Sequence, residues 1–127
     1  KGVPLDINTG IHDGHTGSVP VSHSLRAFNV LAVPDKQVLA EDIDFMVREQ
    51  KIPAVLAAET QNDPEREKIT LFRRSSGNAR VTVFEGGHES ESSAGVLWLS
   101  RQRKGQPADF NLGQKPGQAA ASTEVSK

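Results

Sequence analysis

Residues 80–88 of the chain are RVTVFEGGH, a run of β-branched and aromatic residues followed by two glycines and a histidine. The β-branched residues favour a strand over residues 80–85. Glycine tolerates backbone conformations that other residues avoid, so Gly86 and Gly87 allow the chain to turn sharply directly after this strand. We therefore expect His88 to project over the edge of a sheet.

A second strand followed by a glycine-rich loop lies near the beginning of the chain. Residues 3–8 (VPLDIN) are largely apolar and nearly alternating, which predicts a short strand that stops at a glycine. The loop that follows, residues 10–18 (GIHDGHTGS), contains three glycines and offers His12, Asp13 and His15. Both loops therefore place titratable side chains directly after a strand.

Helices are expected between and after the two strands. Apolar residues recur at helical spacing over residues 20–32 and 40–50, and an apolar segment around Trp98 predicts a third helix over residues 94–103. Residues 54–68 show weak periodicity and are expected to form an insertion or a long loop. Strands separated by helices predict an α/β fold with a parallel sheet, in which reactive groups collect at the carboxyl ends of the strands.

An aspartate and a histidine on neighbouring strand ends can form the Asp–His half of a catalytic triad. The carboxylate fixes the tautomer of the imidazole and stabilises the imidazolium, while the other ring nitrogen takes a proton from a nucleophile. His88 and Asp13 fit this arrangement. The alternatives are a turn-capping role for His88 and an Asx-turn for Asp13, because Asp-Gly is a common turn dipeptide. Asp6 is a rival acid, but its position inside the strand favours a side chain that points away from the site.

The two loops resemble those of a known family. Residues 10–20 (GIHDGHTGSVP) resemble the acid loop of prolyl-oligopeptidase-like α/β-hydrolases, in which an aspartate follows a strand and precedes a Val-Pro pair that opens a helix. Residues 81–89 (VTVFEGGHE) resemble the last strand and histidine loop of that family, and Trp98-Leu99 resembles its closing helix. The order of acid before histidine matches the hydrolase order of Ser, Asp and His. The resemblance extends over about residues 3–110.

The resemblance implies a fold, a reaction and two site residues. The chain would be the C-terminal part of an α/β-hydrolase sheet with flanking helices, an incomplete domain over residues 1–112, with Asp13 and His88 as catalytic residues. The reaction would be that of a serine hydrolase, either a peptidase or an esterase, acting on a peptide or ester substrate. Asp13 lies six residues before Val19, which is farther than usual in the family. His88 follows Asp13 by 75 positions, a long spacing that places an insertion around residues 34–68.

The nucleophile of such an enzyme is missing from the chain. No Gly-x-Ser-x-Gly segment and no His-Gly-Gly-Gly segment occurs in the sequence. We therefore expect the serine and the oxyanion hole in a preceding, N-terminal part of the hydrolase domain, and we expect this chain alone to be inactive. The sequence begins Lys1-Gly2-Val3, without a methionine, and it shows no signal peptide. Any targeting signal is therefore expected upstream, and the localisation of the protein stays open. Residues 113–127 are low in complexity and are expected to be disordered.

Composition narrows the other possibilities. The net charge of -1 leaves no broad basic field for nucleic acid or anionic lipid, and no apolar run approaches the length needed to cross a bilayer. The absence of cysteine excludes disulfides and thiolate zinc sites, and no cofactor is expected. Two alternatives to the enzyme remain. One is a non-catalytic binding or structural domain with a hydrolase fold. The other is a metal-binding module that uses His12, His15 and His23, whose irregular spacing disfavours it.

Several shorter features are assigned by composition alone. Residues 69–72 are apolar but too few for their secondary structure to be assigned, and residues 75–78 carry a turn signal. Arg73-Arg74 and residues 101–104 are expected on solvated helix faces. The glutamates that flank the histidine loop are expected to be surface charges; they are Glu85, Glu89 and Glu91.

Overall fold

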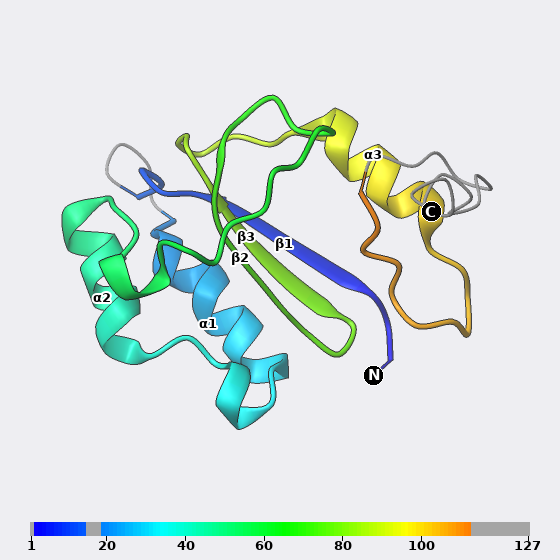
Figure 1. The fold of residues 1–127 in the computed structure, drawn as a ribbon, viewed down its shortest axis with the longest axis horizontal. Coiled ribbons are helices and arrows are strands. Elements are labelled where there is room, and N and C mark those ends of the chain that lie inside the picture. Colours follow the sequence, from blue (N-terminus) through cyan, green and yellow to red (C-terminus); the bar gives the residue numbers. More distant parts are fainter. Residues whose placement is uncertain (1, 15–18, 113–127) are drawn as a thin grey trace, which may run out of the picture.

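The computed structural model describes residues 2–14 and 19–112, and it shows a small mixed α/β fold built on one three-stranded sheet (Figure 1). The strands and helices follow one another as β1 (Leu5–Gly10), α1 (Val21–Leu31), the 3-10 turn η1 (Pro34–Lys36), α2 (Ala40–Glu49), the 3-10 turn η2 (Ala54–Leu56), β2 (Thr70–Ser76), β3 (Ala79–Phe84) and α3 (Ser92–Arg101). The strands predicted at residues 3–8 and 80–85 and the three predicted helices are all present, with bounds that differ by one or two residues.

The sheet has the strand order β1-β3-β2. The parallel pairing expected between the first and last strands is confirmed, with Gly10 opposite Phe84 at the carboxyl ends. The third strand, β2, is antiparallel to β3 and was not assigned from the sequence. The turn signal at residues 75–78 joins β2 to β3, and Gly77 has a φ of +59°, a left-handed conformation suited to a tight hairpin. The expected all-parallel sheet is therefore wrong, and the sheet is mixed.

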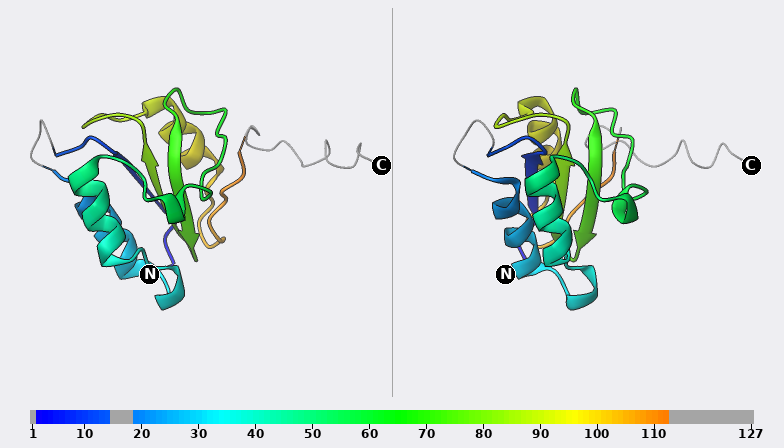
Figure 2. Two further views of the ribbon diagram at one scale, coloured as in Figure 1. Left: turned by 60° about the vertical axis from the view of Figure 1, so that its left-hand side comes forward. Right: turned by 90° about the vertical axis from the view of Figure 1, so that its left-hand side faces the viewer.

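One face of the sheet carries the apolar core. Helices α1 and α2 lie on this side (Figure 2). Leu25 and Phe28 of α1 and Met46 of α2 are fully buried against Val81 and Val83 of β3. Burial of large apolar side chains against a pleated face is the dominant stabilising contribution in such a layer. The apolar residues that recur at helical spacing in the sequence therefore face the sheet, as expected.

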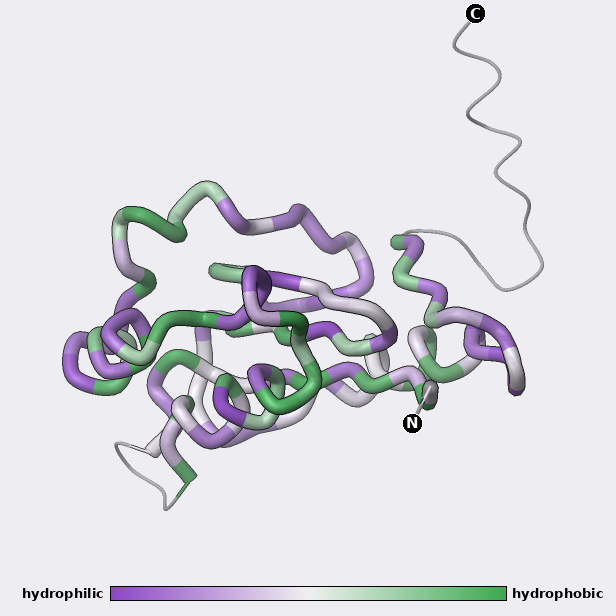
Figure 3. The backbone as a smooth tube through the Cα atoms, turned by 90° about the horizontal axis from the view of Figure 1, so that it is seen from below, coloured by the Kyte–Doolittle hydropathy of each residue, from purple (hydrophilic) through white to green (hydrophobic). Residues whose placement is uncertain are grey.

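The opposite face of the sheet is ionic. The connection between η2 and β2, the arc at the top of Figure 3, runs from hydrophobic near η2 to hydrophilic along most of its remaining length. This connection and α3 cover the second face, where Arg80 of β3 donates to Asp6 of β1 at 2.8 Å and Arg73 of β2 donates to Asp63 of the connection at 3.0 Å. Arg66 also bonds Asp63, at 3.2 Å. The side chains of these five residues are at most 4% exposed.

Two sequence expectations about charged residues are wrong for this reason. Arg73 lies on a strand and is buried, instead of lying on a solvated helix face, and Arg74 is half-buried against Glu59. Arg101 does lie at the end of a helix, but it is buried and pairs with Glu65. Charged groups inside a protein need partners, and the long connection supplies the carboxylates.

Candidate active site

The parallel pairing of β1 and β3 brings the two glycine-rich loops side by side (Figure 1). The pairing continues beyond the strands, because the backbone N–H of Ile11 donates to the carbonyl of Phe84 at 2.9 Å and that of His12 donates to Gly86 at 3.0 Å. Residues 10–14, here called the acid loop, and residues 85–89, here called the histidine loop, therefore run together at the carboxyl edge of the sheet.

Gly10 makes this close approach possible. A Cβ atom placed on Gly10 would lie 2.3 Å from the carbonyl oxygens of both Gly86 and Gly87. No side chain can occupy that space without moving one loop away from the other. Gly14 has a related role at the other end of the acid loop, where its φ is +95° and an added Cβ would meet the backbone of Pro20 at 2.6 Å.

Asp13 and His88, the two residues selected from the sequence, lie in contact. The Nδ1 atom of His88 is 3.1 Å from Oδ1 and 3.3 Å from Oδ2 of Asp13. Asp13 is 9% exposed, while the His88 side chain is 67% exposed. A carboxylate only accepts hydrogen bonds, so Nδ1 donates and the neutral imidazole has its lone pair on Nε2. Within the described part of the chain, Nε2 has no hydrogen-bond partner.

The histidine loop has its own internal support. The carboxylate of Glu89 accepts a hydrogen bond from the backbone N–H of Gly87 at 2.9 Å and pairs with Nζ of Lys68 at 3.2 Å. The backbone hydrogen bond and the lysine hold the pKa of Glu89 below its usual range. Lys68 belongs to the long connection that covers the second face, so this connection also anchors the histidine loop.

A second histidine, His12, joins the two loops. Its Nδ1 lies 2.7 Å from Oε1 of Gln50, the residue that ends α2, and its Nε2 lies 2.5 Å from the carboxylate of Glu85. The sequence singles out His12 only as a possible metal ligand, so its contacts with Gln50 and Glu85 were missed. The signal was present in the strand register, because extending the pairing of Gly10 with Phe84 by two residues brings His12 beside the end of β3.

The rival acid and the flanking glutamates have other partners. Asp6 pairs with Arg80 and Arg66 on the ionic face, which agrees with the expectation that it points away from the site. Glu91 is not a surface charge as expected. Its side chain is 7% exposed and accepts hydrogen bonds from Arg66 at 2.9 Å and from the backbone N–H of Lys68 at 2.8 Å.

The metal-binding alternative gains no support from the described residues. Among them, no group of three or more His, Asp or Glu side chains could hold an ion. His12 is bonded to Gln50 and Glu85, and His23 lies on the exposed side of α1. His15 and the expected disordered tail, residues 113–127, lie outside the described residues.

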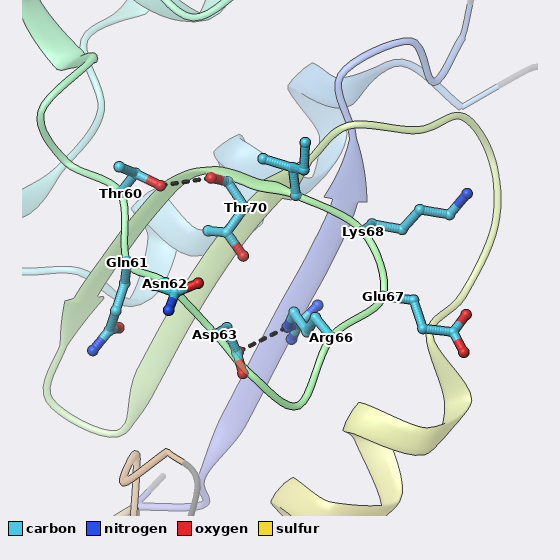
Figure 4. A pocket seen from close by; sticks show the side chains of 9 residues that line it. Thr60, Gln61, Asn62, Asp63, Arg66, Glu67, Lys68 and Thr70 are labelled. Carbon is cyan, nitrogen blue, oxygen red and sulfur yellow. Dashed lines mark hydrogen bonds and ion pairs between the residues drawn. The ribbon is translucent and has the colours of Figure 1, made fainter.

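Neither of two hollows in the described part of the chain is lined by Asp13 or His88. One, of about 370 Å³, is lined by residues that include Gln50, Lys51, Leu71 and Glu85. The other, of about 330 Å³, lies within the connection that covers the ionic face (Figure 4). In this second hollow Asp63 pairs with Arg66, and the hydroxyl of Thr60 donates to the carbonyl of Thr70 at 2.5 Å, while Glu67 and Lys68 point outward. Its two inward charged groups, Asp63 and Arg66, are therefore already paired with each other.

None of the helices in the described ranges has the length and apolar composition needed to cross a bilayer. Comparisons of the chain with protein-family models, with curated proteins and with solved structures found no match.

Proposed function

We propose that this chain supplies the general base and its orienting carboxylate to a serine hydrolase that works by acyl transfer. The observation that supports the proposal is the contact between Nδ1 of His88 and the buried carboxylate of Asp13, with the rest of the imidazole ring exposed. This arrangement leaves the basic Nε2 atom of His88 accessible to a nucleophile. A buried carboxylate behind an exposed imidazole is the arrangement that proton transfer to and from a nucleophile requires.

The chemistry follows from the tautomer of His88. Nε2 takes the proton of a serine hydroxyl as its oxygen bonds to the carbonyl carbon of the substrate, and Asp13 stabilises the resulting imidazolium. Nε2 then gives this proton to the leaving amine or alcohol as the bond to the carbonyl carbon breaks. Water releases the acyl group from the serine by the same two proton transfers. Peptides and esters both fit this reaction.

The fold assignment that belongs to this function is also a proposal. We infer that the chain forms the C-terminal part of an α/β-hydrolase domain, with the serine and the oxyanion hole contributed from sequence outside this chain. In support, β1 and β3 are parallel and carry the acid and the histidine at one edge. Within the described residues, no strand pairs with the outer edge of β1, which leaves a place for a further strand.

The test requires the polypeptide that contains both this chain and the nucleophile. The encoded sequence preceding Lys1 is first searched for a Gly-x-Ser-x-Gly segment between a strand and a helix. Hydrolysis of p-nitrophenyl acetate and of an aminoacyl p-nitroanilide is then compared for the parent, His88→Ala and His23→Ala. His23 is a matched control, because it lies on the exposed side of α1.

The expected result is a loss of kcat of about 10⁴-fold or more for His88→Ala and no change for His23→Ala. Absence of the serine segment would instead favour a non-catalytic domain with the same fold. Hydrolysis that continues unchanged in His88→Ala would refute the role of His88 outright.

A further inference from the structure

We propose that His12 is a positioning residue, a charged clasp that holds the acid loop against the histidine loop and so keeps Asp13 in register with His88. The clasp consists of the His12 ring, the Glu85 carboxylate and the Gln50 amide. Its importance for catalysis rests on the proposed function, whereas its existence does not.

The contacts favour an imidazolium at this position. Nε2 faces the Glu85 carboxylate at 2.5 Å, and Nδ1 faces the amide oxygen of Gln50 at 2.7 Å. Both partner atoms are acceptors, so both ring nitrogens must donate, and only the protonated ring has two N–H groups. When His12 loses a proton, either one contact is lost or the Gln50 amide has to rotate so that its NH₂ group faces the ring.

Gln50 occupies a backbone conformation that fixes its direction. It ends α2 with φ 54° and ψ 41°, and its N–H donates to the carbonyl of Met46 at 3.0 Å. Among the described residues it is the one non-glycine residue with a positive φ. This left-handed conformation is uncommon for residues other than glycine, asparagine and aspartate. The chain turns here and sends the Gln50 side chain to His12, which connects α2 to the site.

The clasp acts on Asp13 through its immediate neighbour in the chain. The backbone N–H of His12 donates to Gly86 at 3.0 Å, and that of Asp13 donates back to Gly10 at 3.1 Å. The His12 side chain thus ties its own residue to Glu85 and Gln50, while the next residue directs its carboxylate to His88. A displacement of the His12 backbone would therefore move Asp13.

The clasp depends on pH, and the direction follows from its partners. The hydrogen bonds to Gln50 and Glu85 raise the pKa of His12 above its ordinary value. The charged or titratable groups on the two loops and beside Gln50 are Glu85, Glu89 and His88 of the histidine loop, Asp13 of the acid loop, and Lys51. Helix α2 itself carries Glu41, Asp42, Asp44, Arg48 and Glu49. A group whose pKa is raised by folding contributes its full stability below its unfolded pKa and loses it as the pH rises through the folded value. The clasp is therefore closed below the ordinary pKa of histidine, and it opens as the pH rises through the raised pKa of His12.

The experiment uses ¹⁵N-labelled chain and follows its histidine side chains by long-range ¹H–¹⁵N NMR spectra against pH. These spectra report the protonation of His12 and the tautomer of neutral His88. A merely structural role for His12 would leave the His88 tautomer unchanged when His12 is replaced. The variants are His12→Asn with His23→Asn as its control, and Glu85→Gln with Glu49→Gln as its control. Glu49 is an exposed carboxylate at the end of α2 that pairs with Arg48.

The parent chain is expected to show neutral His88 with the proton on Nδ1, and His12→Asn is expected to lose this preference. Glu85→Gln keeps the shape of the side chain, so it tests the clasp even where His12→Asn fails to fold. It should lower the pKa of His12 toward the ordinary value, whereas Glu49→Gln should not. In the polypeptide that carries the serine, His12→Asn should lower kcat by up to about 100-fold and leave KM nearly unchanged.

Two outcomes would overturn the proposal. One is a His12 titration that is the same in the parent and in Glu85→Gln, and the other is an unchanged His88 tautomer in His12→Asn. Neither measurement needs a nucleophile, so an inactive protein with an intact clasp would contradict the proposed function alone.

Discussion

Replacement of Gly10 by alanine would force apart the two loops that hold Asp13 and His88. The added methyl group would lie 2.3 Å from the carbonyl oxygens of Gly86 and Gly87, where contacts below 3.0 Å essentially never occur. The loops must therefore separate by at least about 0.7 Å to bring that contact to 3.0 Å. Backbone atoms form both sides of the clash, so no side chain can rotate to relieve it.

The magnitude of the effect follows from this displacement. Forcing an extra methyl group into a closely packed site costs about 1–3 kcal/mol in stability. A similar separation would lengthen the contact from Nδ1 of His88 to Oδ1 of Asp13, now 3.1 Å, to about 3.8 Å, beyond hydrogen-bonding distance. Gly10→Ala should therefore both destabilise the protein and weaken the Asp13–His88 pair.

The assay compares urea denaturation and the tautomer of His88 in the parent, Gly10→Ala and two control variants. Gly87 and Gly95 have open space where a Cβ would lie. Gly87→Ala should leave stability nearly unchanged, although it changes the same loop. Gly95→Ala lies inside α3 and should raise the free energy of unfolding by about 0.5–1 kcal/mol, because alanine favours helices. A Gly10→Ala protein as stable as the parent, with the same His88 tautomer, would refute the close approach of the loops.

Three further predictions concern the acid, the ionic face and the sheet edge. Asp13→Asn should lower kcat by about 10⁴-fold in the polypeptide that carries the serine while leaving the fold intact by circular dichroism, because the amide can stabilise the wrong tautomer of His88; normal kinetics would remove Asp13 from the mechanism. Asp63→Asn should cost about 3 kcal/mol in urea denaturation, since it leaves two buried guanidinium groups with fewer acceptors. Burial alone would raise the pKa of Asp63, but hydrogen bonds from the Glu65 backbone and from Arg73 outweigh burial and lower it. Its contribution should thus be complete above its unfolded pKa and be lost as the pH falls through the folded value, and Asp63→Asn should abolish this part of the acid transition. Finally, the outer edge of β1, with which no strand of the described residues pairs, should make the isolated chain self-associate. Leu5→Lys should reduce the association measured by light scattering, because a charge on an exposed edge opposes strand pairing.

The parts of the fold that follow a simple period could be predicted from the sequence. The buried face of α1 repeats at helical spacing through Leu25 and Phe28, and the structure buries these residues. The β-branched run before Gly86 forms β3 as expected. The juxtaposition of Asp13 and His88 follows from the same reasoning, because residues that end two neighbouring parallel strands must meet at one edge.

The strand β2 could not be predicted in this way, for two physical reasons. Its pairing with β3 has an irregularity between Thr70 and Phe72, which disrupts the alternation that marks a strand. Its next residue, Arg73, points into the ionic face and donates to Thr82 at 2.9 Å, so an arginine occupies a position where a buried apolar residue would be expected. A periodicity argument treats a charged residue as exposed, and this one is buried because its acceptors come from a distant loop.

Residues 34–68, which the sequence predicts to be an insertion, contribute a contact to each of the two site loops. On the apolar side of the sheet, Gln50, the residue directly after α2, contacts His12 of the acid loop. On the ionic side of the sheet, Lys68 pairs with Glu89 of the histidine loop. Both anchors, Gln50 and Lys68, lie within residues 34–68, where the sequence predicts an insertion. The hydrogen bond between Asp13 and His88 joins two short loops, and each loop is also bonded to a residue from this segment. Precise placement of the pair should therefore depend on residues 34–68 as well as on the two glycine-rich loops.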